Sequence, residues 1–276
     1  MDFIGLESLP VEVIILPPSP GFRTEHHQLL YEVQLHALSE SFPITSRHIY
    51  AVFQLSPASF RSQYLSGRAF ARGPQDMASI FTKILRYPIC TEEVVEHLVP
   101  LLAERGLDVK ASRFDIPKRL FRSLAPKPGS IRWKEQEPPL LFLQYLFDSP
   151  GIPKPNVNSH GGYALTKAVH AKFIPLIRFL LDYGAEPQCK NCLAIFVAIR
   201  QKDLALVKLL IERDDSSYTD CLGTGKRKRR KLEDRVVVNS AMLKAAVKCD
   251  ARDIVDYMAR EKGCIPDMQT LHMMAK

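Results

Sequence analysis

The C-terminal half of the chain repeats one pattern of apolar and polar positions. Each copy joins a short apolar segment to a second one a few residues later. The copies are 163–168 with 174–181, 193–198 with 204–210, and 241–246 with 253–258, and a fourth opens at 270–275. Leu165, Ala168 and Val169 are spaced three and four residues apart, which places them on one face of a helix. The pattern predicts pairs of short helices, each stable only when packed on its neighbours.

Residues that favour helix ends lie at the expected positions of this pattern. Pro175 lies at the start of a second helix, where a missing N–H costs nothing. Gly184 lies just past the end of that helix, where a left-handed cap favours glycine. Asp203 is placed to cap the helix that begins at residue 204.

Weaker copies of the pattern precede residue 160. Residues 91–105 predict a helix that Pro100 would kink or divide, and 81–85 would belong to the helix before it. A further pair is predicted at 116–124 and 140–147. We interpret 76–160 as two degenerate repeats with a proline-stiffened insertion near 125–139.

The repeats resemble the ankyrin family. Residues 163–168 and, more closely, 270–275 (Thr-Leu-His-Met-Met-Ala) are similar to the family's Thr-Pro-Leu-His-x-Ala opening. Residues 206–210 (Leu-Val-Lys-Leu-Leu) are similar to its second helix, and Gly184-Ala185 to its turn. The family's histidine position holds Thr166, Phe196 and Lys244, so the hydrogen bond of that histidine is not expected here. The resemblance implies an all-α, ankyrin-type helical-repeat solenoid over residues 76–276.

The N-terminal segment resembles an F-box, a small three-helix module. Residues 9–12 (Leu-Pro-Val-Glu) are similar to its opening, and Ser46-Arg47 followed by Tyr50 to its later Ser/Cys-Arg pair and aromatic residue. Residues 15–30 interrupt the first helix and are expected to loop out. The resemblance implies an F-box-like helical module over residues 1–70 that docks on a Skp-type adaptor of a cullin ubiquitin ligase. The adaptor-binding residues would be Leu9, Pro10, Val13 and Ile14.

Charge is concentrated in one segment. The net charge is +8, and six positive charges form one uninterrupted run within the predicted insertion at 216–238. The run is Lys226, Arg227, Lys228, Arg229, Arg230 and Lys231. One hypothesis is a nuclear import signal read by an import receptor; the alternative is a solvated charge run. Because the rest of the chain is nearly neutral, a protein that coats nucleic acid is not expected.

Composition and apolar run lengths limit the cellular context. Hydrophobic residues make up 46% and charged residues 25%, as in ordinary globular chains. No apolar run reaches the roughly 18 residues that a membrane helix needs, and the N-terminus lacks a basic, then apolar, secretory signal. We therefore expect a nuclear or cytoplasmic protein with reduced cysteines. The combination of F-box-like and ankyrin-like segments resembles a pattern common in fungal proteins.

Few residues suggest chemistry. Cys189 and Cys192 have CxxC spacing, but no second such pair or Cys/His pair completes a zinc site. A zinc or thiol-redox protein using these two cysteines stays open as a hypothesis of another class. The eight histidines are scattered, and Trp133, the single tryptophan, is either a core residue or a partner anchor. No catalysis, cofactor or metal is predicted.

The ankyrin resemblance also implies a partner-binding face, formed by loop tips and by the outer side of the first helices. Four Lys and Arg residues on it have no acidic neighbour in the sequence pattern, which favours an acidic protein partner on the concave face; an ordinary solvated helix face is the alternative. On the helices, the residues of this face are Lys167, His170, Arg200, Gln201, Lys244 and Lys248, and the tips carry Asn158, His160, Gln188 and Lys190.

The sequence leads to two main hypotheses of function. The first is a non-catalytic substrate receptor that links a target, bound by the repeats, to a ubiquitin ligase. The second is an ankyrin-type scaffold or nuclear regulatory protein without a ubiquitin link, in which the N-terminal helices cap the solenoid.

Overall fold

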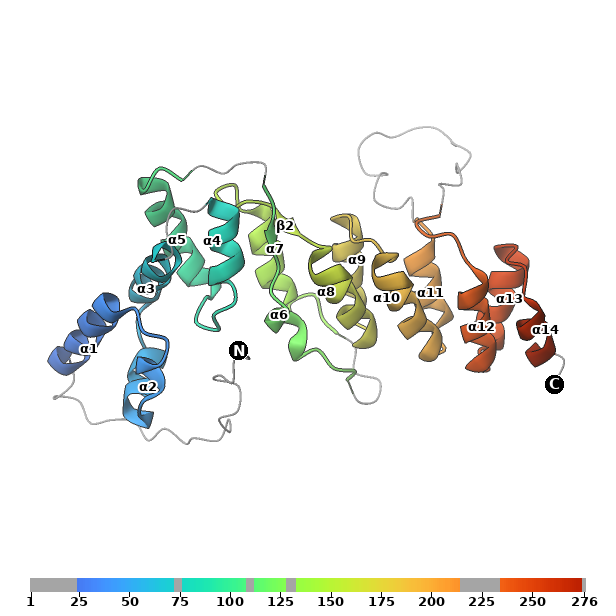
Figure 1. Cartoon of the computed structure of the whole chain (residues 1–276), viewed down its shortest axis with the longest axis horizontal. Coiled ribbons are helices and arrows are strands. Elements are labelled where there is room, and N and C mark those ends of the chain that lie inside the picture. The colour runs from blue at the N-terminus through green and yellow to red at the C-terminus, as the bar shows by residue number, and fades with distance from the viewer. Residues whose placement is uncertain (1–23, 72–75, 108–111, 128–132, 214–233, 275–276) are drawn as a thin grey trace. The chain divides into compact units, whose positions relative to one another are not determined.

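A computed structural model describes residues 24–71, 76–107, 112–127, 133–213 and 234–274. The described chain is mainly α-helical, so the prediction of an all-α class is confirmed (Figure 1). It divides into two compact units. Unit 1 runs to Phe114 and adds Ser149–Lys154, and unit 2 consists of Asp115–Asp148 and the chain from Pro155 onward. No described helix combines the length and apolar character needed to cross a bilayer.

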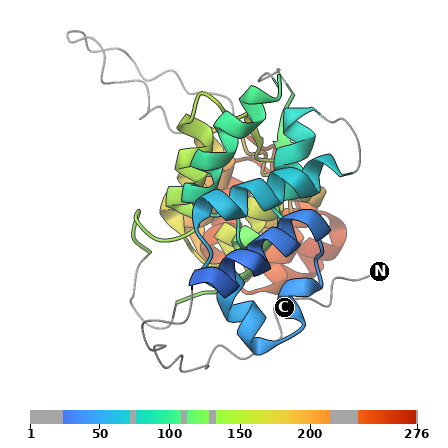
Figure 2. The same ribbon diagram turned by 90° about the vertical axis from the view of Figure 1, so that its left-hand side faces the viewer.

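The described residues of unit 1 form a cluster of five α-helices and one short 3-10 turn. Its elements are α1 (Thr24–Ala37), η1 (Phe42–Ile44), α2 (Arg47–Gln54), α3 (Ala58–Phe70), α4 (Met77–Ile84) and α5 (Glu92–Glu104). Helix α3 packs on α1, α4 and α5, and the blue α1 and cyan α3 run side by side in Figure 2. Since α3 and α5 pack on each other, the boundary predicted near residues 70–76 does not coincide with the division between the units.

Two expectations for unit 1 need correction. Residues 24–30 were expected in a looped-out insertion, but they form the first turns of α1. Pro100 was expected to kink or divide its helix, yet α5 continues through it as one element, with Leu98 and Leu102 buried on either side.

Unit 2 is built mainly from short helices in pairs. Its elements are α6 (Arg119–Arg122), α7 (Leu140–Asp148), α8 (Ser159–His170), α9 (Ile174–Asp182), α10 (Cys189–Arg200), α11 (Leu204–Ile211), α12 (Ser240–Lys248), α13 (Arg252–Asp256), η3 (Tyr257–Glu261) and α14 (Met268–Met274). Two strands, β1 (Phe114–Asp115) and β2 (Pro155–Asn156), pair with each other. The helix predicted at 116–124 shrinks to the four residues of α6, because β1 and a turn occupy the preceding stretch.

The first helices of successive pairs pack on one another. Helix α8 contacts α9 and α10, α10 contacts α11 and α12, and α12 contacts α13 and α14 (Figure 1). The stripe predicted from spacing is buried as expected, since Leu165, Ala168 and Val169 are almost fully inaccessible. One continuous hydrophobic core therefore runs through these pairs.

The helix ends follow the local signals of the sequence. Asp203 accepts a hydrogen bond of 3.1 Å from the backbone N–H of Leu206, and Pro175 lies in the first turn of α9. Gly184 has a φ of +87° and closes α9, with its N–H donating to the carbonyl of Leu181. These predictions are confirmed.

The same turn recurs at equivalent positions of three pairs. Lys172, Lys202 and Asp250 follow the ends of α8, α10 and α12 with φ of 55°, 53° and 50°. In each case the next residue's N–H bonds back to the helix, as from Phe173 to the carbonyl of Ala168 at 3.0 Å. Each turn has two such backbone hydrogen bonds, which is the pattern of the Schellman motif at a helix end. The spacing of 30 and 48 residues equals that of the sequence pattern.

Trp133 packs against the core of unit 2 rather than standing free. Its ring stacks on Phe173 with 4.6 Å between centroids, and its Nε1–H donates to the carbonyl oxygen of Ala171 at 2.8 Å. The ammonium of Lys127 also lies over the ring, 4.2 Å from its centroid. Of the two roles open to this tryptophan, the structure favours core packing.

Candidate binding surface

Left-handed turns position the first helices of unit 2. His160, Gly161 and Gly162 all have positive φ at the start of α8, and residues 190–192, thirty positions later, repeat the three positive φ values at the start of α10. The regular helix therefore begins at equivalent places in both pairs, and it also ends at equivalent places. Residues at the same position of the repeated pattern therefore lie at equivalent positions on the surfaces of α8 and α10.

One such position carries a basic side chain in three successive pairs, a histidine followed by an arginine and a lysine. His170, Arg200 and Lys248 are each the last residue of a first helix, and all three are exposed. We call these three residues the cationic row. No carboxylate in the described part of the chain lies within ion-pair distance of Arg200 or Lys248. Positive charge at a helix C-terminus is favoured by the helix dipole, so the row is stable without acidic partners.

Two further cations of the predicted face are half-buried. Lys167 lies one turn before the end of α8. Lys244 lies 4.0 Å from a carboxylate oxygen of Asp267 and also bonds to the side-chain oxygen of Gln269. The expectation that Lys244 has no acidic neighbour is therefore wrong, because α14 brings Asp267 to α12 across a turn that the repeat pattern does not describe.

The amides of the predicted face bind backbone groups of neighbouring pairs. The Nε2 of Gln201 donates to the carbonyl of His170 at 2.9 Å, and that of Gln188 to the carbonyl of Arg235 at 3.1 Å. Asn158 accepts from the N–H of Glu186 at 2.9 Å. These three side chains join successive pairs, so they are less available to a partner than the sequence suggested.

The tip residues differ in their surroundings. His160 and Lys190 are exposed and lie at equivalent positions of the left-handed turns. The aliphatic stem of Lys190 passes over Gly161, so close that a Cβ there would come within 3.0 Å of its Cε. Lys190 thus packs its stem on the preceding turn.

The CxxC thiols are in an environment that disfavours the thiolate. Burial raises the pKa of both Cys189 and Cys192, and the carboxylate of Glu186 raises that of Cys189 further. Metal binding and thiol exchange both use the thiolate. Among the described residues, no three His, Cys, Asp or Glu side chains converge as a metal site requires.

A shallow groove crosses α12 and α14, at the end of the cationic row. Its volume is about 540 Å³, and its lining is Lys244, Lys248, Met268, Gln269, His272 and Met273. Two lysines of this lining were predicted from the sequence, but the α14 residues were not. The spacing of Met268, Leu271 and Met274 indicates an apolar stripe on α14, but of these three only Met268 lines the groove.

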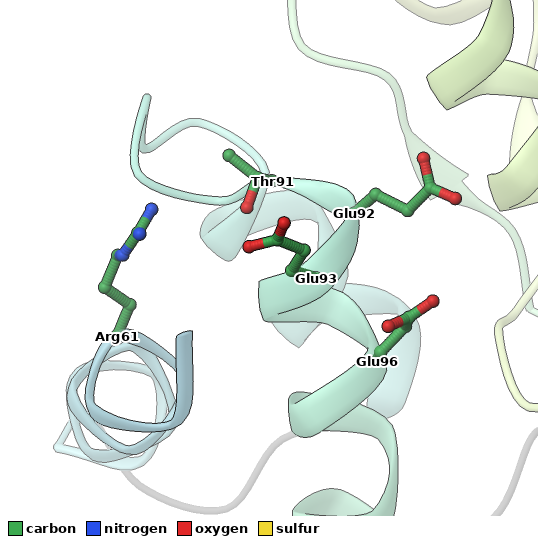
Figure 3. Close-up of a pocket in the computed structure, with 5 residues that line it drawn as sticks. All are labelled: Arg61, Thr91, Glu92, Glu93 and Glu96. Carbon is green, nitrogen blue, oxygen red and sulfur yellow. The ribbon is translucent and has the colours of Figure 1, made fainter. Parts of the chain in front are cut away.

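Unit 1 has a hollow of a different character at the start of α5. It is lined by Arg61, Thr91, Glu92, Glu93 and Glu96, and Figure 3 shows the Arg61 side chain rising towards the start of α5. The guanidinium of Arg61 already donates to the carbonyl of Ser56 at 2.9 Å. The hollow is thus a solvated acidic helix face beside a structural arginine.

A partly exposed ion cluster in unit 2 was missed by the sequence analysis. The ammonium of Lys262 lies 3.0 Å from Glu212 and 2.8 Å from Asp234, and the hydroxyl of Tyr257 donates to Glu212 at 2.9 Å. Burial lowers the pKa of Lys262, but its hydrogen bonds to the two carboxylates raise it more, so the net shift is upward. The partners are far apart in sequence, and no local motif marks them.

Two predicted sites lie outside the described residues. These are the adaptor-binding residues Leu9, Pro10, Val13 and Ile14, and the basic run 226–231. Both stay predictions. No family model, curated protein or solved structure matches this chain.

Proposed function

We propose that this protein is a non-catalytic binding module whose helix pairs, of ankyrin type, capture an acidic protein partner. The observation that carries the proposal is the cationic row: His170, Arg200 and Lys248 are exposed at one repeated position. The positive charges of Arg200 and Lys248, which have no carboxylate within ion-pair distance among the described residues, attract an oppositely charged surface and speed its association.

The repeating geometry supports the ankyrin-type interpretation. Three helix endings share one left-handed turn at Lys172, Lys202 and Asp250, and first helices pack on first helices. In repeat proteins of this kind, each unit buries its apolar face on the next, which leaves an extended surface for binding. The amide contacts of Gln188 and Gln201 between pairs fit the same scheme.

Charge reversal tests the proposed face. His170→Glu combined with Arg200→Glu should reduce recovery of acidic partners in affinity capture with quantitative mass spectrometry. The matched control is Arg178→Glu, which reverses an exposed charge on the second helix α9. Equal recovery of the same partners with the row variant and with the control would contradict the proposal.

The link to a ubiquitin ligase belongs to this proposal through the F-box-like segment. Leu9 and Pro10 would contribute apolar area to an adaptor interface. Co-precipitation of a Skp-type adaptor and cullin should therefore fall when Leu9→Ala and Pro10→Ala are combined. If no adaptor is recovered with the wild-type chain, the protein is instead an ankyrin-type scaffold without a ubiquitin link.

Nuclear import through the basic run is a separate part of the proposal. A fluorescent fusion in which residues 226–231 are all alanine should lose nuclear signal relative to the wild-type fusion. An unchanged nuclear fraction would mean that the run is only a solvated charge segment.

A further inference from the structure

The last helix of the described chain presents an unusually apolar surface. In α14, Met268 is 81% exposed, Leu271 46% and Met274 47%, and Ile265 just before the helix is 84% exposed. Exposed apolar residues gathered on one short segment commonly mark an interaction site. Methionine suits such a surface because its flexible, polarisable thioether adapts to differently shaped side chains.

The groove beside this helix combines apolar and cationic walls. Met268 and Met273 line it from α14, and Lys244 and Lys248 line it from α12. The stems of lysine residues add apolar area to such a groove while their ammonium groups reach the rim. The groove can therefore hold an apolar side chain and ionic groups at the same time.

The charge balance at the groove is positive. Asp267 lies 4.0 Å from Lys244, at the outer limit of an ion pair, and both Asp267 and the Lys244 ammonium remain partly exposed. Lys248 has no carboxylate within ion-pair distance in the described ranges, and the imidazole of His272 also lines the groove. A ligand that matches this groove must carry negative charge beside an apolar group.

We propose that the groove across α12 and α14 binds an acidic peptide segment of a partner protein, with one leucine- or methionine-sized side chain placed between Met268 and Met273. Carboxylates flanking that side chain pair with Lys248 and Lys244. The inference rests on the proposed function, since it specifies where a partner is held and by which chemistry. The lysine ammonium groups at the rim favour peptides that carry carboxylates. Met268 and Met273 favour, among acidic peptides, those that also carry an apolar side chain.

A synthetic peptide tests the groove directly. The probe is a fluorescein-labelled peptide of glutamates with a central leucine pair, titrated with the full chain and followed by fluorescence anisotropy. One control peptide replaces the leucines by serine, and another replaces the glutamates by lysine. The leucine-containing acidic peptide should bind more tightly than either control, and its binding should weaken as added salt screens the exposed charges.

Two protein variants test the apolar and the cationic contacts of the groove separately. Met268→Ser removes the apolar contact and Lys248→Glu reverses a rim charge, and each should weaken binding about fivefold or more. Arg178→Glu is the charge-matched control and should bind like wild type. Because Met268 and Lys248 are both exposed, neither substitution removes core packing, and circular dichroism of each variant verifies the fold.

The outcomes distinguish the groove from the proposed function as a whole. Equal binding of the leucine and serine peptides, or unchanged binding by Met268→Ser and Lys248→Glu, would overturn the groove proposal. If the peptide does not bind but His170→Glu with Arg200→Glu still abolishes partner capture, the proposed function stands and the groove proposal fails. If the peptide binds as described while capture is insensitive to the row variant, the groove proposal stands and the proposed role of the cationic row fails.

Discussion

The Nε1–H of Trp133 donates a 2.8 Å hydrogen bond to the backbone oxygen of Ala171, at the turn between α8 and α9. The proline-rich segment before α7 is thereby attached to the first clear helix pair. Trp133 stacks on Phe173, and the Lys127 ammonium also lies over the ring. The predicted insertion near 125–139 therefore contributes a side chain to the core.

Removing this hydrogen bond should destabilise unit 2 modestly, and removing the ring should do so strongly. Trp133→Phe keeps the stacking and should lower the free energy of unfolding by about 1 kcal/mol. Trp133→Ala should lower it by about 2 kcal/mol or more, because a large half-buried aromatic surface is lost. Urea unfolding followed by far-ultraviolet circular dichroism measures both, and a Trp133→Ala midpoint equal to wild type would contradict the contact.

Asp203 should stabilise α11 chiefly as its cap. Asp203→Ala should cost about 1 kcal/mol in free energy of unfolding, because the N–H of Leu206 loses its acceptor. Asp203 also pairs with Lys172 at 3.3 Å, but that exposed pair contributes little. Asp203→Asn, which keeps a capping oxygen and removes the charge, should therefore retain most of the stability. If Asn costs as much as Ala in thermal unfolding, the ion pair and not the cap is the larger contribution.

Lys202 and Gly184 both have left-handed backbone, so replacing Lys202 by glycine and replacing Gly184 by alanine should change the free energy of unfolding in opposite directions. Lys202 holds a φ of +53°, which costs energy for a residue with a Cβ, and no described side chain pairs with its ammonium. Lys202→Gly should raise the free energy of unfolding by about 0.5–1 kcal/mol. Gly184 holds a φ of +87° with open space around a would-be Cβ, so Gly184→Ala should lower it by about 1 kcal/mol through backbone strain alone. Changes of the same sign in chemical denaturation would show that local contacts, not φ, decide these positions.

The ion cluster around Lys262 should make the protein less stable at alkaline pH. Burial raises the pKa of Tyr257 above its ordinary 10.0, and its hydrogen bond to Glu212 raises it further. The pKa of Lys262 is also raised in the folded chain, above 10.5. As pH rises, the unfolded chain therefore loses these protons before the folded chain does, so stability is full below about pH 10 and declines above it.

Thermal unfolding between about pH 8 and pH 11 checks this effect. Wild type should lose melting temperature above about pH 10. Tyr257→Phe removes one of the two titrating groups, and Lys262→Met removes the other while leaving Glu212 and Asp234 without their cation. Both variants should show a shallower alkaline decline, and Lys262→Met should also melt lower at neutral pH. An alkaline decline as steep in both variants as in wild type would assign it to other groups.

Local signals in the sequence were sufficient for the ends of α9 and the start of α11 in unit 2, but not for α6, which is shorter than predicted. Pro175, Gly184 and Asp203 act within one turn of the chain, so their roles do not depend on what lies next to them in space. The spacing of Leu165, Ala168 and Val169 likewise determines a buried face wherever that face packs. The resemblance of these pairs to ankyrin repeats and the import role of the basic run stay predictions, as does the adaptor contact of Leu9 and Pro10.

Residues whose role depends on neighbouring pairs were predicted less well. Gln201 was assigned to a partner-binding face, but it bonds to His170, thirty-one residues away. Lys244 was expected without an acid, but α14 places Asp267 beside it.

The sequence by itself therefore determined that the chain is helical, where the repeated helices begin and end, and which of their faces are apolar. Each of these features follows from interactions within a few residues. The tertiary structure alone decided that Trp133 joins the core, that Lys262 gathers Glu212 and Asp234, and that Met268 lies beside Lys248 in one groove. These contacts join residues distant in sequence, and their geometry is set by how whole helices pack, which no local pattern encodes.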